Sequence, residues 1–236
     1  MSLIFLAGAS RGVGREIAKR LVVGGYDVVA LLRNNRATEQ LMAMGITVVS
    51  GDAMDADMMT RIMGDFPVDC VISTIGGTPD DGGPRADFTG NKNLIDAAVV
   101  TQAKRFVMIS SIGSGNSAQA LPPNVLETLG PVLKEKAQAE EHLAKSGLDY
   151  TVIRPGGLVS ESATGKEILT EDMTVAGSIP RAGVAALAVK CLDTDRTVNK
   201  VFSAIDLSMQ RTDKEIDIFE FESAQEQADG LSAGEE

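Results

Sequence analysis

Three glycines near the start of the chain have the spacing of a loop that binds the phosphates of a dinucleotide. Gly8, Gly12 and Gly14 lie between an apolar stretch, residues 3–7, and an amphipathic stretch, residues 15–23. The first glycine permits a sharp turn after a strand, the second lets the backbone approach a pyrophosphate, and the third lets a helix pack closely on a sheet. The N–H groups of the first helical turn, reinforced by the helix dipole, would face the anion. The pattern predicts a dinucleotide site; the alternative is an ordinary glycine-rich turn.

The residues after the second apolar stretch, residues 27–32, bear on which dinucleotide binds. A site for NAD places Asp or Glu here to accept from the ribose 2′-hydroxyl, whereas this chain has Arg33 and Asn34, followed by Arg36. A carboxylate would repel a 2′-phosphate, but a guanidinium binds it through two hydrogen bonds. Arg11 could reach the same phosphate from the glycine loop. We therefore expect NADP(H); the alternative is that Arg33 is a solvated residue at a strand end.

Strand-like and helix-like stretches alternate along the chain, which predicts an α/β fold with a single Rossmann-type doubly wound parallel sheet and helices on both faces. The expected strands are residues 3–7, 27–32, 46–49, 69–73, 105–110, 150–154 and 200–205. The expected helices are residues 15–23, 36–44, 55–63, 88–101, 128–146 and 181–192. We expect one domain, residues 1–221, and an acidic tail, residues 222–236.

Ligands of such a sheet bind beyond the carboxyl ends of its strands. The loops expected at that edge are polar or glycine-rich and comprise residues 8–14, 33–34, 52–53, 74–77, 110–114 and 155–158. Asp52 could accept from an adenine amino group, with Asp55 left to cap the next helix. A hydroxyl of Ser110 or Ser111 could meet a substrate carbonyl. Over the first five loops we expect cofactor contacts from Gly8, Ser10, Arg11, Gly12, Val13, Gly14, Arg33, Asn34, Asp52, Ala53, Thr74, Ile75, Gly76 and Ser110.

The composition limits the partners. The 236-residue chain has a net charge of −11, which argues against binding to nucleic acid. No apolar run approaches the roughly 18 residues of a membrane span, and the first strand begins at once, so we expect neither a membrane span nor a targeting peptide. Cys70 and Cys191 form no CxxC pair, and His142 is the only histidine, so we expect no metal site and, by default, a cytoplasmic protein.

Five segments together resemble a known family. They are the glycine loop, Asp87-Phe-Thr-Gly-Asn91-Lys-Asn-Leu-Ile-Asp-Ala-Ala98, residues 105–113, Lys136-Ala-Gln-Ala-Glu140 and residues 146–157. As a set they resemble an atypical short-chain dehydrogenase/reductase of the NAD(P)-binding, NmrA-like group, which includes flavin and biliverdin reductases and Tic62-type proteins. The resemblance covers about residues 1–205 and is more specific for fold and cofactor than for substrate.

The resemblance implies roles at matching positions. Ser111 corresponds to the active-site serine, and Lys136 to the lysine that bonds the nicotinamide ribose; Lys134 is the rival for that role. Pro155, Gly156, Gly157 and Leu158 correspond to the turn whose backbone holds the nicotinamide carboxamide. Asn91 corresponds to the asparagine that steadies the site through its backbone. Ser111 could instead merely cap a turn.

The chain departs from the family's main branch at one position. That branch has a tyrosine four residues before the lysine, where this chain has Val132, and its two tyrosines, Tyr26 and Tyr150, lie elsewhere. The usual proton donor for ketone reduction is therefore missing. Reduction of a conjugated ring tolerates this better, because the proton can come from solvent.

Three functions remain open at this point. The first is an NADPH-dependent reductase of a flavin or related conjugated ring, acting as a monomer or small homo-oligomer, with the acceptor held by residues 112–127 and 158–178. The second is a non-enzymatic NADP(H)-binding redox sensor or complex-assembly factor. The third, a sugar-nucleotide epimerase or ketone reductase, ranks last because it needs another acid near the nicotinamide.

Overall fold

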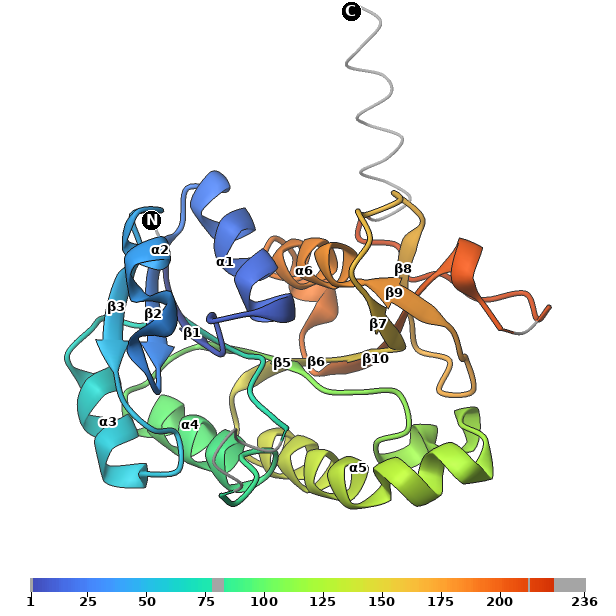
Figure 1. Ribbon diagram of the computed structural model, residues 1–236, viewed down its shortest axis with the longest axis horizontal. Coiled ribbons are helices and arrows are strands. Elements are labelled where there is room, and N and C mark those ends of the chain that lie inside the picture. Colours follow the sequence, from blue (N-terminus) through green and yellow to red (C-terminus); the bar gives the residue numbers. More distant parts are fainter. Residues whose placement is uncertain (1, 78–82, 212, 223–236) are drawn as a thin grey trace, which may run out of the picture.

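A computed structural model describes residues 2–77, 83–211 and 213–222. Its centre is a sheet of eight strands in the order β3-β2-β1-β4-β5-β6-β10-β8 (Figure 1). All neighbouring strands are parallel except β8, which runs antiparallel to β10. In chain order, the strands of this sheet are β1 Leu3–Ala7, β2 Asp27–Leu32, β3 Thr47–Ser50, β4 Cys70–Ser73, β5 Arg105–Ile109, β6 Asp149–Pro155, β8 Glu167–Thr170 and β10 Lys200–Asp206. The predicted Rossmann-type α/β fold is confirmed.

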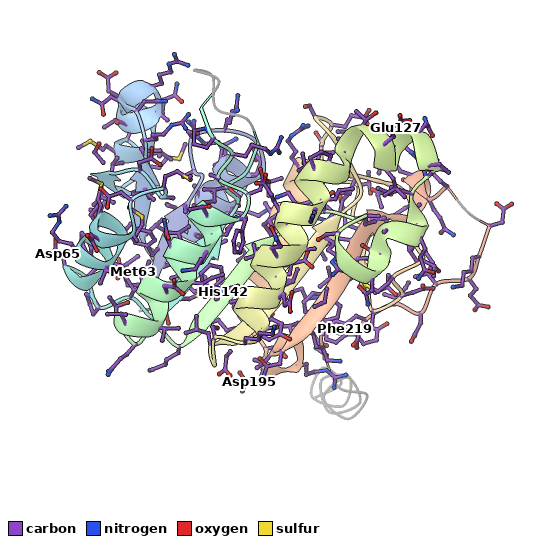
Figure 2. The ribbon with its side chains drawn as sticks, turned by 90° about the horizontal axis from the view of Figure 1, so that it is seen from below. Met63, Asp65, Glu127, His142, Asp195 and Phe219 are labelled. Atoms are coloured by element: carbon purple, nitrogen blue, oxygen red, sulfur yellow. The ribbon has the colours of Figure 1, made fainter. Side chains whose placement is uncertain are left out.

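Helices cover both faces of the sheet. The α-helices are α1 Gly12–Val23, α2 Thr38–Met42, α3 Ala56–Gly64, α4 Thr89–Val100, α5 Pro123–Ala144 and α6 Arg181–Lys190. Ile17 of α1, Leu41 of α2 and Val184 of α6 belong to the apolar core on one face. Met59 of α3, Leu94 of α4 and Leu143 of α5 belong to the core on the other face. Figure 2 looks onto this second layer, with Met63 marked on α3 and His142 on α5.

Residues 158–178, one of the two segments expected to hold the acceptor, contain strands that were not predicted from the sequence. Besides β8, a two-stranded parallel pair joins β7 Gly157–Val159 to β9 Ser178–Pro180. Strands of three or four residues are too short to show a period of two, and the partner of β8 is distant in sequence, so no local pattern announces them. Residues 158–178 are therefore partly β-structure and not only a loop.

Two helices begin earlier than expected. The sequence predicted starts at residues 15 and 128, but α1 begins at Gly12 and α5 at Pro123. Proline suits the first helical position because no N–H is needed there. The tail lies outside the described residues from 223 onward.

Candidate functional site

A cavity of about 690 Å³ opens at the carboxyl ends of the parallel strands. Its size suits a cofactor-sized ligand. The structure brings all six predicted loops to this cavity. The predicted residues that line it are Gly8, Ser10, Arg11, Gly12, Val13, Gly14, Arg33, Asn34, Asp52, Ala53, Thr74, Ile75, Gly76, Ser110, Ser111, Lys136, Pro155 and Leu158.

Gly156 and Gly157, also predicted to contact the cofactor, do not line this cavity. Their N–H groups donate instead to the carbonyls of Ala204 and Gly177, each at 2.9 Å. A Cβ on Gly156 would lie 2.9 Å from the Gly177 carbonyl carbon. These glycines therefore allow the turn after β6 to pack against the Gly177 segment.

The glycine loop has the geometry that its spacing predicted. Gly8 has a φ of +96°, so the chain turns sharply after β1. A Cβ on Gly14 would lie 2.6 Å from Thr74 Oγ1 and closer still to the Gly8 carbonyl oxygen. Only glycine permits this approach of α1 to the ends of β1 and β4, which directs the first turn of α1 into the cavity.

Cationic side chains lie at one end of the cavity, beside β2. Arg11 and Arg33 are exposed, and neither side chain has a hydrogen bond or ion pair within the described part of the chain. Arg15 is committed to the loop itself, because it donates to the carbonyls of Ala9 and Ser10. Asn34 Oδ1 accepts from the N–H of Arg36 at 3.2 Å and so shapes the turn after β2.

Among the described residues around the cavity, cations outnumber carboxylates, although the whole chain carries a net charge of −11. The acidic residues that line it within this part of the chain are Asp52 and Asp87. The cationic residues in the lining are Arg11, Arg15, Arg33, Arg36, Arg85, Arg181 and Lys136. A cleft lined by one sign of charge favours a ligand of the opposite sign, so this cavity suits a polyanion.

Asp52 shapes its own loop, since its Oδ1 accepts from the N–H of Met54 at 3.0 Å. Asp55 caps α3 by accepting from the N–H of Met58 at 2.9 Å, as expected. Asp52 is therefore not needed as the helix cap, and it remains on the cavity wall.

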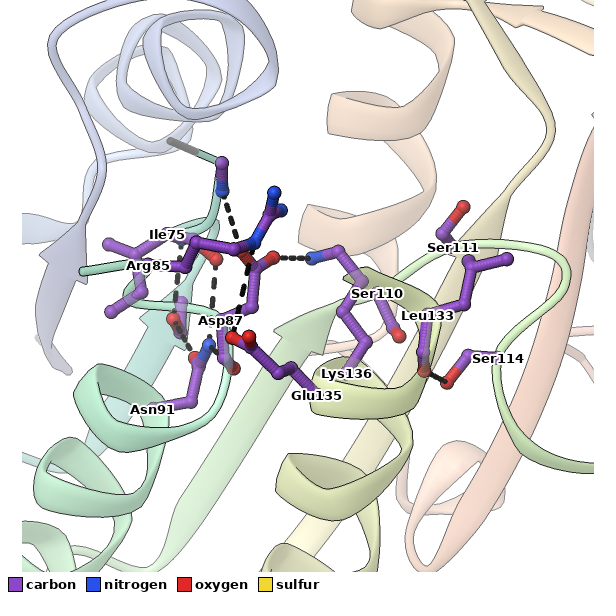
Figure 3. A network of polar contacts seen from close by, with 12 residues as sticks. Ile75, Arg85, Asp87, Asn91, Ser110, Ser111, Ser114, Leu133, Glu135 and Lys136 are labelled. Carbon is purple, nitrogen blue, oxygen red and sulfur yellow. Dashed lines mark hydrogen bonds and ion pairs between the residues drawn. The ribbon is translucent and has the colours of Figure 1, made fainter. Parts of the chain in front are cut away.

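A buried carboxylate fixes Lys136 at the opposite end of the cavity (Figure 3). Asp87 Oδ1 lies 3.2 Å from Lys136 Nζ, while Oδ2 accepts from Gly77 N at 2.8 Å and Arg85 Nη2 at 2.9 Å. Asp87 has no solvent exposure. Lys134, the rival candidate, is exposed and lies off the cavity.

Two adjacent serines after β5 face different partners. Ser110 Oγ donates to the carboxylate of Glu140 on α5. Ser111 Oγ donates to the carbonyl of Ile112 at 3.0 Å, and Ser111 also lines the cavity. Ser111 and Lys136 therefore line the same cavity.

Asn91 is held in place by its side chain. The role through the backbone that the resemblance implied stays a prediction. The Oδ1 of Asn91 accepts from Ser73 Oγ at 2.6 Å, and its Nδ2 donates to the Asp87 carbonyl at 2.8 Å. Asn91 therefore joins the end of β4 to the residue that holds Lys136.

No phenol lines this cavity. Tyr26 donates its hydroxyl to Asp193 Oδ1 at 2.8 Å, and burial, helped by that hydrogen bond and the Asp193 charge, raises the pKa of Tyr26 to about 12. Tyr150 lies in β6 and packs against the apolar core on the sheet face that α3, α4 and α5 cover. Val132 lines the cavity one helical turn before Lys136.

Three site residues were missed by the sequence reasoning. Asp87 contacts Lys136, and Arg85 donates to Asp87. Arg181 begins α6 beside the glycine loop and donates to Ser160 Oγ at 2.9 Å. Asp87 begins the segment Asp87–Ala98, which carries part of the family resemblance, and this was the signal that could have identified it. Arg181 had none, because only the tertiary fold brings α6 beside α1.

Metal and membrane features are absent from the described ranges. They contain no cluster of three or more His, Cys, Asp or Glu residues fit for a metal ion. No helix among them is long and apolar enough to cross a membrane. Cys70 and Cys191 are unpaired, and burial raises the pKa of each thiol to about 12.

Comparison with known protein families gives the class of the chain. A model of the NAD(P)H-binding family matches residues 8–195. The chain belongs to this family. The resemblance to atypical short-chain dehydrogenases/reductases is thereby confirmed, and the chain is an NAD(P)H-binding member of an oxidoreductase family.

Individual relatives differ in what they do. ChuY, described as an anaerobillin reductase from Escherichia coli O157:H7, is 30% identical with a TM-score of 0.81, covering 89% of this chain and 100% of ChuY. Protein TIC 62 of Pisum sativum is 31% identical over 86% of this chain, which spans only 43% of TIC 62. The photosystem II assembly factor Ycf39 of Cyanophora paradoxa is 26% identical, over 86% of this chain and 63% of Ycf39.

Proposed function

We propose that this protein is an NADPH-dependent reductase that passes hydride to a flavin or a related conjugated ring. The observation that carries the proposal is Val132 on the cavity wall, where the main branch of the resembling family has its tyrosine, one turn before Lys136. Without that phenol, a proton for an alkoxide has no obvious source, whereas a reduced conjugated ring can take its proton from water. The similarity to ChuY supports a reductase of this kind.

We propose NADPH, not NADH, as the cofactor. The exposed guanidiniums of Arg11 and Arg33 suit a 2′-phosphate, since a guanidinium forms paired, charge-assisted hydrogen bonds to phosphate oxygens. The N–H groups in the first turn of α1 would bind the pyrophosphate. A 2′-phosphate adds the negative charge that the cationic lining favours.

At the proposed nicotinamide end of the cavity, residues of this chain would hold and orient the cofactor and the acceptor. The bound cofactor supplies the hydride. Asp87 holds the Lys136 ammonium in the cavity wall, where it can donate a hydrogen bond to the nicotinamide ribose. The hydroxyl of Ser111 lies in the same wall and can donate to a polar atom of the acceptor. Leu158 offers an apolar surface to an aromatic ring.

Steady-state oxidation of NADPH with FMN, FAD and biliverdin as acceptors tests the proposal. We expect acceptor-dependent turnover with at least one ring. Tight binding of NADPH without turnover of any of them would refute the reductase.

A non-enzymatic NADP(H)-binding assembly factor or redox sensor is the second candidate, favoured by the similarity to Ycf39. It predicts a protein partner whose affinity differs between NADP⁺ and NADPH, with no hydride acceptor. We further propose a cytoplasmic monomer or small homo-oligomer with one domain over residues 1–221; two unpaired, buried thiols suit a reducing compartment.

A further inference from the structure

We infer that Glu140 and Arg154 are positioning residues that join the nicotinamide end of the cavity to the two segments expected to hold the acceptor. The inference rests on the proposed reductase function, and it concerns a buried pair of side chains that no step of that function uses. Glu140 lies on α5, one turn after Lys136, and Arg154 lies near the end of β6.

The carboxylate of Glu140 binds two elements at once. Its Oε1 accepts from Ser110 Oγ and from Arg154 Nε at 3.2 Å, and its Oε2 accepts from Arg154 Nη2 at 2.6 Å. Because the Ser110 hydroxyl donates to Glu140, its hydrogen points away from the cavity that Ser110 lines. Ser110 Oγ, with its two lone pairs, can therefore only accept from a ligand.

The guanidinium of Arg154 extends this connection to the acceptor side. Its Nη1 donates to Asn116 Oδ1 at 2.6 Å and to Met173 Sδ at 3.1 Å. Asn116 lies in the 3₁₀ helix Gly115–Ala120, and Met173 lies between β8 and β9. Arg154 thus connects segments 112–127 and 158–178, which are separated by 30 residues along the chain.

The backbone makes room for the guanidinium. Gly115 has a φ of +53°, and a Cβ there would lie 2.9 Å from Arg154 Nη2. Glycine at this position therefore permits both the left-handed turn and the close approach of the arginine.

Burial explains why this pair is a positioning device. The side chains of Arg154 and Glu140 are 5% and 7% exposed. A buried ion pair stabilises a fold no better than apolar residues of the same volume, since both charges lose their hydration. What apolar residues would not supply is directional hydrogen bonding to Ser110, Asn116 and Met173.

The side chains of Lys136 and Glu140 share one face of α5, because residues four apart lie one above the other on a helix. Lys136 reaches Asp87, and Glu140 reaches Ser110 and Arg154. Helix α5 thereby fixes the position of Lys136 relative to segments 112–127 and 158–178.

Kinetics of Glu140→Gln and Arg154→Met, with Glu141→Gln as the matched control, test this inference. Glu141 is the next residue on α5 and forms an exposed pair with Lys145. We expect acceptor kcat/KM to fall by about 10²-fold in each single variant, the loss typical of a 1 Å misplacement, while the Kd for NADPH stays within about threefold of wild type. The double variant should lose little more than either single variant, because the pair acts as a unit.

Asn116→Ala provides a variant that does not disturb the core, since Asn116 is exposed. We expect a raised acceptor KM with unchanged NADPH affinity. Hydrogen exchange gives a readout that needs no turnover: residues 112–120 and 171–176 should exchange faster in Glu140→Gln, with β1 and α1 unchanged.

The outcomes separate the two proposals. Faster exchange confined to those two segments, in a protein that turns over no acceptor, would contradict the reductase but keep the structural link. Wild-type turnover with unaltered acceptor kinetics in Asn116→Ala and in both single variants would overturn the positioning role. Exchange that rises throughout the chain, or NADPH affinity that falls as much as acceptor kcat/KM, would also overturn it.

Discussion

Replacing Gly14 by alanine perturbs the contact between α1 and the sheet without touching any charge. The added Cβ would lie 2.6 Å from Thr74 Oγ1 and 2.7 Å from the Gly8 carbonyl carbon, closer than real Cβ contacts. Thr74 is itself held by its hydrogen bond to the Ala7 carbonyl at 3.2 Å, so neither neighbour can yield easily. The start of α1 must therefore move away by about 1 Å, because close-packed interiors transmit strain.

The size of the effect follows from this displacement. Overpacking of a core costs about 1–3 kcal/mol, which for a chain of this size lowers Tm by about 2–4 °C per kcal/mol. The N–H groups of α1 also move relative to the pyrophosphate, so we expect the Kd for NADPH to rise at least about tenfold, the equivalent of 1.4 kcal/mol.

Gly64→Ala is the matched control. Gly64 also lies within a helix, α3, but it is exposed, and a Cβ there would lie 3.9 Å from Thr101 Cγ2, an ordinary contact distance. This variant should gain about 0.4–1 kcal/mol through the unfolded state and bind NADPH as wild type does. Thermal unfolding and NADPH fluorescence titration measure both quantities. A Gly14→Ala protein with wild-type Tm and wild-type NADPH affinity would refute the close-approach argument.

Three further predictions concern charge. Arg33→Asp should weaken NADPH binding by at least about tenfold, since hydrogen bonds to charged groups contribute about 1.5–3 kcal/mol. The affinity for NADH should stay nearly unchanged. Equal losses of NADPH and NADH affinity in titrations would rule out the phosphate contact. Lys136→Met should lower kcat by about 10²-fold, while Lys134→Met, on an exposed residue, should not; similar rates for both variants would count against Lys136. The Lys214 ammonium, followed by Thr174, lowers the pKa of Asp172 from 3.8 to about 2. The ion pair between Asp172 and Lys214 therefore stabilises the folded protein above about pH 4, and this contribution is lost as the pH falls to 2. Asp172→Asn should lower the free energy of unfolding by roughly 0.5 kcal/mol at pH 7, measured by urea titration. A loss that persists at pH 2 would exclude the ion pair.

The glycine loop could be predicted because its physical causes are local. Gly8 must turn and Gly14 must let a helix approach a sheet, and both requirements are visible in the residue types. The parallel core strands followed for the same reason, since β1 and β2 are short apolar runs whose predicted bounds match the structure.

The acceptor side could not be predicted because its contacts are distant in sequence. The choice of Lys136 over Lys134 depends on how α5 is rotated toward Asp87, 49 residues away along the printed sequence. The link from Glu140 through Arg154 to Met173 joins α5, β6 and a segment between short strands. Glu140 and Arg154 are of residue types that usually lie at the surface, and only the tertiary fold buries them.

Single-turnover oxidation of NADPH deuterated at nicotinamide C4, mixed with protein and an excess of FMN or biliverdin, tests hydride transfer to a conjugated ring most directly. We predict an acceptor-dependent decay of NADPH absorbance that slows when one of the two C4 hydrogens is deuterium, although Val132 stands where a tyrosine would supply a proton. Tight NADPH binding with no acceptor-dependent decay, for either ring, would contradict the account and favour a nucleotide-binding protein without catalysis.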